Sequence, residues 1–265
     1  MSFKDKLVWI TGASSGIGEE LTVAFAATGA RLILSARRVE ELERVAARCD
    51  ADHDKILILP FDMTDTASVT AAADQARDRA GPIDILVNNA GVALRALIEN
   101  TELDVYRTMM ETNFFGPVAL TQAVLPQMLE RKKGDIVVIG SPAGLFGTPI
   151  RSGYCASKFA VHGFFECLRA EVRDRGVKVS LVIPGPVRTN MSVASLTGDG
   201  GKHGEMDKFI AEGIDPAVCA QKILAGVGRG DEEIYIVTGE VRRAIWTRRF
   251  WPSRFFRTAA EKAPK

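Results

Sequence analysis

A tyrosine and a lysine stand four positions apart in the stretch SGYCASKFAVHGFFECLRAEV, at Tyr154 and Lys158. The apolar residues of this stretch recur at helical spacing, and residues four apart on a helix are neighbours on one face. A free tyrosine has a pKa of about 10 and is a poor base at neutral pH. Because a neighbouring ammonium favours the phenolate, we expect Lys158 to lower the pKa of Tyr154, making it a proton donor and acceptor.

Two further polar residues could assist such a proton transfer. Ser141 follows the strand-like run DIVVIG, and its hydroxyl could bind a carbonyl or alcohol oxygen and stabilise the charge that develops there. Asn113 lies in METNFFG, within a helical stretch. Each residue also has a structural interpretation. A serine commonly ends a strand, an asparagine caps a helix or bridges backbone groups, and a tyrosine at a helix start packs against its neighbours.

A glycine cluster, TGASSGIG at 11–18, follows the strand-like run KLVWI and precedes a helix-like run. Glycines let a backbone approach a pyrophosphate closely, and a helix N-terminus favours negative charge. The spacing of Gly12, Gly16 and Gly18 differs from the GxGxxG of the commonest dinucleotide-binding fingerprint. The cluster therefore indicates a phosphate site, with tight helix–strand packing as the structural alternative.

Two arginines, Arg37 and Arg38, follow the strand-like run RLILSA. An NAD site usually has an acid here that accepts hydrogen bonds from the ribose hydroxyls. Arginines instead hold a 2′-phosphate through paired hydrogen bonds, so the sequence favours NADP(H) over NAD(H). The alternative is a charged, solvated helix start in which Glu40 and Glu41 pair with the arginines.

These residues must be positioned by alternating strands and helices. Short β-branched runs that are apolar on both faces alternate with helix-like runs, as in a parallel sheet covered on both sides. This alternation, with right-handed crossovers, predicts an α/β doubly wound parallel sheet flanked by helices in a single domain. The stretch 190–214 is the least patterned internal part, and we expect a mobile flap or a surface loop there.

The motifs, taken in order, resemble those of the short-chain dehydrogenase/reductase family. They are TGASSGIG at 11–18, Asp62 in PFDMTD, NNAG at 88–91, Asn113 in METNFFG, Ser141 in GSPAG, YCASK at 154–158 and PGPVRT at 184–189. The resemblance covers about residues 3–240 and implies a Rossmann-like catalytic domain over 1–240, followed by a basic and aromatic tail over 241–265.

The resemblance also implies roles for individual residues. Asn113, Ser141, Tyr154 and Lys158 would be catalytic, with Asn113 holding a water that links Lys158 to solvent and Lys158 contacting the nicotinamide ribose. Asp62 would accept from the adenine amino group, and Thr189 would bind the carboxamide or a phosphate. The cofactor-binding residues implied are Gly12, Ser14, Ser15, Gly16, Ile17, Gly18, Arg37, Arg38, Asp62, Met63, Asn89, Ala90, Gly91, Tyr154, Lys158, Pro184, Gly185, Val187 and Thr189.

We therefore expect an NADP(H)-dependent oxidoreductase that interconverts a carbonyl and an alcohol by hydride transfer, with Tyr154 as general acid and base. The substrate would be a small-molecule ketone, aldehyde or alcohol, and the stretch 190–214 would select it. A catalytically idle NADP(H)-binding sensor and an imine or enoyl reductase on the same scaffold are the alternatives. By resemblance, a homo-oligomer, either dimer or tetramer, is expected.

Composition narrows the class of protein. The chain has 265 residues and a net charge of +1, so no general attraction to nucleic acid is indicated. Its four cysteines form no CxxC pair and its three histidines are scattered, so we expect reduced thiols and no metal site. Neither a signal peptide nor a transmembrane run is recognisable, and we expect a cytoplasmic protein.

The tail interleaves arginines with Trp246, Phe250, Trp251, Phe255 and Phe256. The aromatic residues could pack on the protein body or on a second subunit, with the arginine side chains extending to solvent. Residues 244–257 could instead make a peripheral membrane contact, which would favour a hydrophobic or lipid-like substrate. Nucleic-acid binding is a further interpretation, though not the expected one. Pro252 predicts two short helices rather than one.

Overall fold

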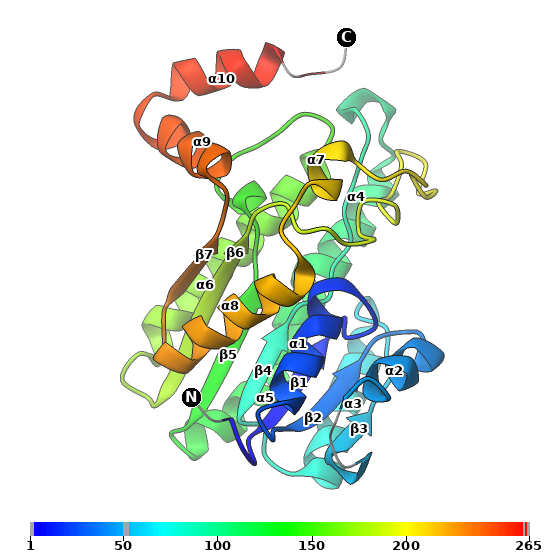
Figure 1. The fold of residues 1–265 in the computed structure, drawn as a ribbon, viewed down its shortest axis with the longest axis vertical. Coiled ribbons are helices and arrows are strands. Elements are labelled where there is room, and N and C mark those ends of the chain that lie inside the picture. Colours follow the sequence, from blue (N-terminus) through cyan, green and yellow to red (C-terminus); the bar gives the residue numbers. More distant parts are fainter. Residues whose placement is uncertain (1–2, 50–52, 262, 264–265) are drawn as a thin grey trace.

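The strand-like runs form one parallel sheet in the computed structural model, which describes residues 3–49, 53–261 and 263. The strand order is β3-β2-β1-β4-β5-β6-β7, which confirms the predicted doubly wound fold (Figure 1). The strands are β1 (Leu7–Thr11), β2 (Arg31–Ser35), β3 (Ile56–Ile58), β4 (Ile85–Asn88), β5 (Gly134–Ile139), β6 (Val177–Pro184) and β7 (Glu233–Ile236). The order reverses between β1 and β4, and parallel sheets bind ligands beyond the carboxyl ends of their strands at such a point.

Helices cover both faces of the sheet because alternate strand residues point to opposite sides. In β1, Val8 and Ile10 join one apolar cluster, whereas Leu7 and Trp9 join the other. The first cluster lies under α1 (Gly16–Ala26), α2 (Val39–Ala46) and α8 (Pro216–Arg229), and the second under α3 (Thr66–Ala80), α5 (Gly116–Glu130) and α6 (Ser152–Val172).

The helix starts follow ordinary capping chemistry. Asp65 caps α3 by accepting hydrogen bonds from the backbone of the first turn, and Asp215 caps α8 in the same way. Gly230 ends α8 in a left-handed conformation that glycine adopts without strain. The remaining helical elements are α4 (Leu103–Met110), a π-turn η3 (Glu111–Phe115), α7 (Lys208–Ala211), and three short turns, η1 (His53–Lys55), η2 (Ile98–Asn100) and η4 (Pro142–Gly144).

The stretch 190–214 contains α7 but is otherwise irregular. It is joined to the segment 93–102 by backbone hydrogen bonds, from Leu196 N to Ala93 O at 2.8 Å and from Arg95 N to Leu196 O at 2.9 Å. Glu102 N likewise donates to Gly198 O at 2.8 Å. The stretch therefore lies along the 93–102 segment beyond the carboxyl ends of the strands.

The tail forms two helices, α9 (Gly239–Phe250) and α10 (Pro252–Glu261), at one end of the molecule (Figure 1). Pro252 begins the second helix, which confirms the predicted interruption. Among the described helices, none is long and apolar enough to cross a membrane.

Candidate active site

A cavity of about 1130 Å³ opens beyond the carboxyl ends of the strands. Its walls include the turn after β1, the ends of β4, β5 and β6, and parts of the stretch 190–214. Every residue predicted to be catalytic or cofactor-binding lines it except Gly18 and Asn113, which lie behind the wall. The fold therefore brings the separate sequence motifs to one place.

The glycine cluster forms a turn between β1 and α1, which we call the cradle, and most of its residues line the cavity. Gly12 and Gly16 have φ of +64° and +60°, a region that residues with side chains rarely adopt. A Cβ on Gly18 would overlap the Gly12 carbonyl and lie 2.5 Å from Asn89 Nδ2. Ser15 is the N-cap of α1, and its side chain caps no backbone group of the first turn. The cradle thus combines close backbone approach with the start of a helix, as a pyrophosphate requires.

The two arginines after β2 are exposed and line the cavity. Arg37 Nη1 lies 3.9 Å from Asp62 Oδ2, whereas Asp62 Oδ1 accepts hydrogen bonds from Thr64 N and Thr64 Oγ1, both at 2.9 Å. No described ion pair joins Arg37 or Arg38 to the glutamates that follow them. The pairing with Glu40 and Glu41 is therefore not observed, while the exposure of both arginines fits a solvated helix start as well as a phosphate site.

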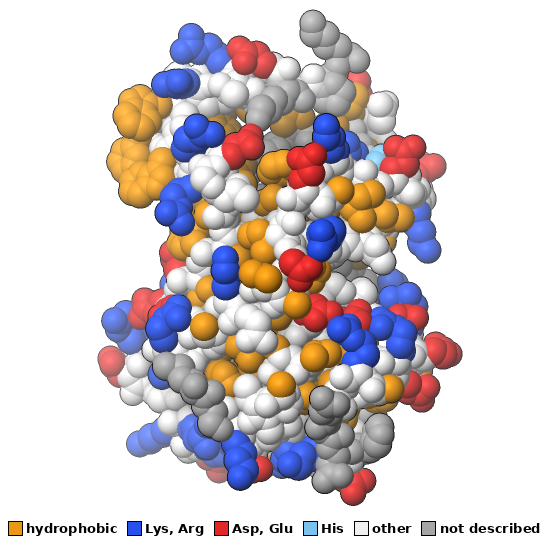
Figure 2. Space-filling model, in the orientation of Figure 1, with side chains coloured by type: hydrophobic (Ala, Val, Ile, Leu, Met, Phe, Trp, Pro, Cys, Tyr) orange, Lys and Arg blue, Asp and Glu red, His pale blue; other side chains and the backbone are white. Residues whose placement is uncertain are grey.

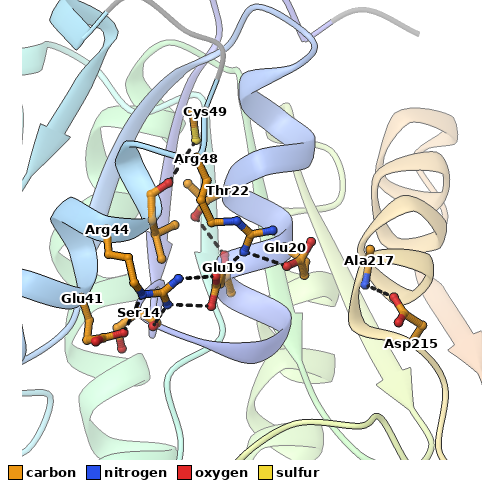
Figure 3. Close-up of polar contacts among 12 residues, drawn as sticks. Ser14, Glu19, Glu20, Thr22, Glu41, Arg44, Arg48, Cys49, Asp215 and Ala217 are labelled. Atoms are coloured by element: carbon orange, nitrogen blue, oxygen red, sulfur yellow. Dashed lines mark hydrogen bonds and ion pairs between the residues drawn. The ribbon is translucent and has the colours of Figure 1, made fainter.

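Sequence reasoning missed the residue that Glu41 does contact, Arg44 (Figure 3). Arg44 donates from Nη1 and Nη2 to the two carboxylate oxygens of Glu19 at 2.8 and 3.0 Å, and from Nη2 to Ser14 O at 3.4 Å. Arg48 also contacts Glu19. The hydrogen bond from Arg44 lowers the pKa of Glu19, although burial opposes it. This network fixes α2 to the first turn of α1 and so braces the cradle.

The NNAG motif braces the same cradle from the other side. Asn89 Nδ2 donates to Thr11 O at 2.9 Å and to Gly12 O at 3.2 Å. Thr11 Oγ1 accepts from Asn89 N at 3.0 Å and from Ala90 N at 3.1 Å. Asn89 therefore holds β4 against β1, and it also lines the cavity.

Ser141, Tyr154 and Lys158 meet in the wall of the cavity. The Ser141 hydroxyl lies near enough to the Tyr154 phenol to lower its pKa, and Lys158 Nζ lies 5.8 Å from the centre of the Tyr154 ring. Lys158 Nζ donates to Ile139 O at 2.8 Å. The lysine is 6% exposed, and this burial lowers its pKa to about 8.

The expectation that Lys158 lowers the pKa of Tyr154 is wrong for this structure. Burial raises the pKa of the Tyr154 phenol, and this effect exceeds the lowering by the nearby Ser141 hydroxyl and by the charge of Arg151. The physical reason is that the ammonium of Lys158 is directed to the carbonyl of Ile139, while the phenol interacts with the serine. Tyr154 is therefore held in its protonated form.

Asn113 lies behind this wall in the π-turn η3 and is 1% exposed. Its Oδ1 accepts from Val92 N at 2.8 Å, and its Nδ2 donates to Val92 O and to Ser157 Oγ, both at 2.9 Å. Ser157 Oγ in turn donates to Tyr154 O at 2.9 Å. The asparagine side chain is thus a brace for the first turn of α6, and the water that the family resemblance assigns to it stays a prediction.

His162, which the sequence suggests is an ordinary helix residue, lies beneath Ser141. Its Nε2 accepts a hydrogen bond from Ser141 N at 3.4 Å, and a Cβ on Gly140 or Gly144 would come within 2.5 or 2.6 Å of that atom. Burial, assisted by the charge of Lys158, lowers its pKa to about 4, so the ring is neutral. Its spacing of four from Lys158 was the signal that could have revealed this contact.

Asp207 fastens the stretch 190–214 to the opposite side of the cavity. It forms ion pairs with Arg95 and with Arg151, the latter at 3.5 Å between Nη2 and Oδ2. Burial acts to raise the pKa of Asp207, but its hydrogen bond with Arg95 and the charge of Arg151 lower it overall. Lys202 and Phe209 of this stretch line the cavity, whereas His203 does not.

Two further features concern metal ligands and cysteines among the described residues. They contain no group of three or more His, Cys, Asp or Glu side chains that could hold a metal ion. All four cysteines are free, as the sequence predicts, and Cys219 is buried, which raises the pKa of its thiol to about 12.

Comparison with known proteins agrees with this arrangement. The family model described as short chain dehydrogenase matches residues 6–199. "Dehydrogenase/reductase SDR family member 7B" of Danio rerio is 44% identical over 270 residues, which span all of this chain and 87% of that protein. The crystal structure of a short-chain dehydrogenase from Streptomyces avermitilis has a TM-score of 0.83 at 32% identity, covering 99% of this chain and 98% of that one.

Two more distant structures show the fold alone. One is a short chain dehydrogenase/reductase from Burkholderia phymatum in complex with NAD, with a TM-score of 0.83 at 22% identity over 94% of both chains. The other is a short chain dehydrogenase from Burkholderia cenocepacia J2315 in complex with NADP, with a TM-score of 0.80 at 24% identity over the whole of both chains. The chain belongs to the short chain dehydrogenase family of oxidoreductases.

Proposed function

We propose that this chain is an NADPH-dependent reductase of ketones or aldehydes. The observation that carries this proposal is the continuity of one cavity, in which the cradle of residues 12–18 leads directly to Ser141, Tyr154 and Lys158. A binding protein that only sensed a dinucleotide would need the first feature but not the second.

The residues of the cavity fit a nicotinamide dinucleotide. The glycine cradle would hold the pyrophosphate, and Asp62 and Met63 would lie by the adenine. Thr189 closes over the cradle, since its Cγ2 would be 3.1 Å from a Cβ on Gly16. When bound, NADPH would supply the hydride for the carbonyl carbon.

The chain's own residues would bind and protonate the oxygen of the substrate. The Ser141 hydroxyl can donate a hydrogen bond to the carbonyl oxygen, which stabilises the negative charge that develops during reduction. The Tyr154 hydroxyl can then give that oxygen a proton, and its raised pKa keeps the proton in place until the alkoxide forms. Lys158 lies beside the phenol, with Nζ 5.8 Å from the ring centre, and would contact the nicotinamide ribose.

We propose Arg37 and Arg38 as the source of a preference for NADPH over NADH, because both line the cavity and no acid ends β2. One hydrogen bond between charged groups contributes about 1.5–3 kcal/mol to the binding free energy. Replacing both arginines by alanine should therefore weaken NADPH binding at least about tenfold. NADH binding should change little. Nucleotide fluorescence titration measures both, with Arg79→Ala as an exposed control; equal effects on the two nucleotides would contradict the assignment.

We further propose a hydrophobic carbonyl substrate. The cavity wall beyond Tyr154 includes the apolar side chains of Leu94, Phe146, Leu196 and Val241. NADPH oxidation should therefore rise from short ketones to long-chain or steroidal ones, and should vanish in Tyr154→Phe. Turnover confined to small water-soluble carbonyls would refute the hydrophobic class, and turnover of imines or enoyl compounds alone would refute carbonyl reduction.

A homo-oligomer is also proposed, through the exposed apolar side of η3 and α6. Phe115 and Phe159 are 48% and 46% exposed there, more than soluble surfaces usually leave phenylalanine. Light scattering should show a dimer or tetramer that Phe115→Ser and Phe159→Ser weaken. A monomer at all concentrations would contradict this proposal.

A further inference from the structure

One face of α9 carries both aromatic and basic side chains. Arg242, Trp246 and Phe250 are spaced four residues apart, and Arg243 and Arg249 each stand three residues from Trp246. Residues at these spacings share one side of a helix. With the adjoining Trp251, they form a continuous surface that we call the basic–aromatic patch. Each of its members is exposed.

The aromatic rings of the patch are not packed in the hydrophobic core. Trp246 and Phe250 are each 56% exposed and stack on each other with ring centres 5.3 Å apart, and Trp251 is 62% exposed. The opposite sides of the two helices provide the anchoring, because Val241 is buried and Phe255 packs on Phe146 with ring centres 5.2 Å apart. Figure 2 shows hydrophobic side chains protruding at the α9 end of the molecule, with Lys and Arg side chains beside them.

The charge of these two helices is strongly positive. Residues 239–261 contain six arginines and only two glutamates, although the whole chain has a net charge of +1. The surplus is therefore concentrated at one end of a molecule whose remainder is slightly acidic. Clustered arginines next to exposed tryptophan and phenylalanine are typical of helices that lie in a membrane interface, where the rings enter the headgroup region and the arginines meet lipid phosphates.

We propose that the basic–aromatic patch binds the surface of an anionic lipid bilayer. A symmetric contact between two copies through this patch would bring its arginines against each other, and like charges in contact oppose association. An anionic bilayer satisfies both components of the patch, since it attracts the arginines and accepts the rings. The inference does not depend on the reaction proposed above.

The position of the patch gives this binding a consequence for the cavity. Val241, in the first turn of α9, lines the cavity, and Phe146, which anchors α10, lines it as well. Docking through the patch would thus place the apolar end of the cavity near the lipid. The benefit of this placement for catalysis rests on the proposed hydrophobic substrate, whereas the binding to lipid does not.

The test is flotation of the full chain with vesicles of phosphatidylcholine alone or mixed with phosphatidylserine. Binding should require phosphatidylserine and should decline as salt is added, because the arginine contribution is screened. Each arginine near such a surface contributes about fivefold in affinity, so Arg242→Gln with Arg249→Gln should weaken binding about 30-fold. Trp246→Ala with Phe250→Ala should reduce it by at least about tenfold.

The matched control is Arg173→Gln with Arg175→Gln, which removes the same charge from exposed positions after the C-terminal end of α6, away from the patch. This variant should bind like the wild type. Loss of binding in the control equal to that in the patch variants would overturn the proposal, because net charge alone would then explain the effect. NADPH binding verifies that every variant is folded, since the cradle of residues 12–18 is distant from these substitutions.

Two other outcomes would also overturn the proposal. The first is absence of flotation together with an oligomer that the aromatic double variant dissociates, which would make a second copy the occupant. The second is retention of an oligonucleotide duplex without flotation, which would make nucleic acid the occupant.

Discussion

Replacing Lys158 by methionine should change how the stability of this protein depends on pH. Lys158 is 6% exposed, and burial lowers its pKa to about 8, whereas a lysine in the unfolded chain titrates near its usual pKa of 10.5. The folded state therefore holds this proton less tightly than the unfolded state. Charged Lys158 disfavours folding at every pH below about 8, and the cost is relieved as pH rises from 8 towards 10.5.

The magnitude follows from the size of the shift. One pKa unit corresponds to about 1.4 kcal/mol, so a shift of this size costs about 3 kcal/mol at neutral pH and about 2 kcal/mol less near pH 9.5. Methionine removes the cost but also leaves Ile139 O without the hydrogen bond it accepts at 2.8 Å, which costs about 1–3 kcal/mol at all pH values. The difference in unfolding free energy between the wild type and Lys158→Met at any one pH is therefore small. The test is how this difference changes with pH.

Urea unfolding of the wild type and Lys158→Met, at intervals from pH 7 to pH 9.5, measures this difference. The free energy of unfolding of the wild type should rise by about 2 kcal/mol relative to that of the variant between pH 7 and pH 9.5. Other groups that titrate there, such as Cys219, are present in both proteins and cancel. The exposed Lys208→Met serves as the control and should run parallel to the wild type. Parallel curves for Lys158→Met as well would refute the assignment of a strained, buried ammonium.

Three further predictions concern the reaction and its cradle. Tyr154→Phe should lower kcat by at least about 100-fold while the dissociation constant of NADPH, measured by fluorescence, stays within about twofold. Gly18→Ala should abolish NADPH binding, because its Cβ would overlap a carbonyl oxygen of the cradle, whereas Gly163→Ala, with nothing within 4 Å of its Cβ, should bind normally. His162→Leu leaves the backbone N–H of Ser141 without its acceptor and should lower kcat about tenfold with little change in the KM for NADPH; His162→Gln should recover part of the loss, and an equal loss in both variants would contradict an acceptor role.

The sequence predicted the fold and the composition of the cavity wall because both depend on local patterns. Strands apolar on both faces specify a parallel sheet, and a parallel sheet brings the residues after its strands to one edge. Arg37, Ser141 and Thr189 could be placed in this way without knowledge of any side-chain contact. The two tail helices were predictable for the same reason, since a proline sets the start of a helix regardless of what surrounds it.

The contacts behind the wall could not be predicted because they join residues from different elements. Arg44 and Glu19 are separated by 25 positions and pair only because α2 lies beside α1. Nothing in VEELERVAARC distinguishes Arg44, which donates to Ser14 O in the cradle, from Arg48, which does not. His162 is a related case, because its helical spacing from Lys158 was visible, while the approach of Gly140 and Gly144 beneath the ring was not.

The pair that the sequence identified most readily is also the one whose electrostatics it misjudged. Helical spacing brings the side chains of Tyr154 and Lys158 together, but it does not determine which acceptor the lysine ammonium binds. The ammonium donates to the backbone carbonyl of Ile139, because a neutral phenol is a weaker acceptor than a backbone carbonyl. Burial lowers the pKa of Lys158 to about 8 and raises the pKa of the Tyr154 phenol. At neutral pH the phenol is therefore protonated and can act as an acid. Such an acid suits protonation of an oxygen, which is the step that the proposed carbonyl reduction requires.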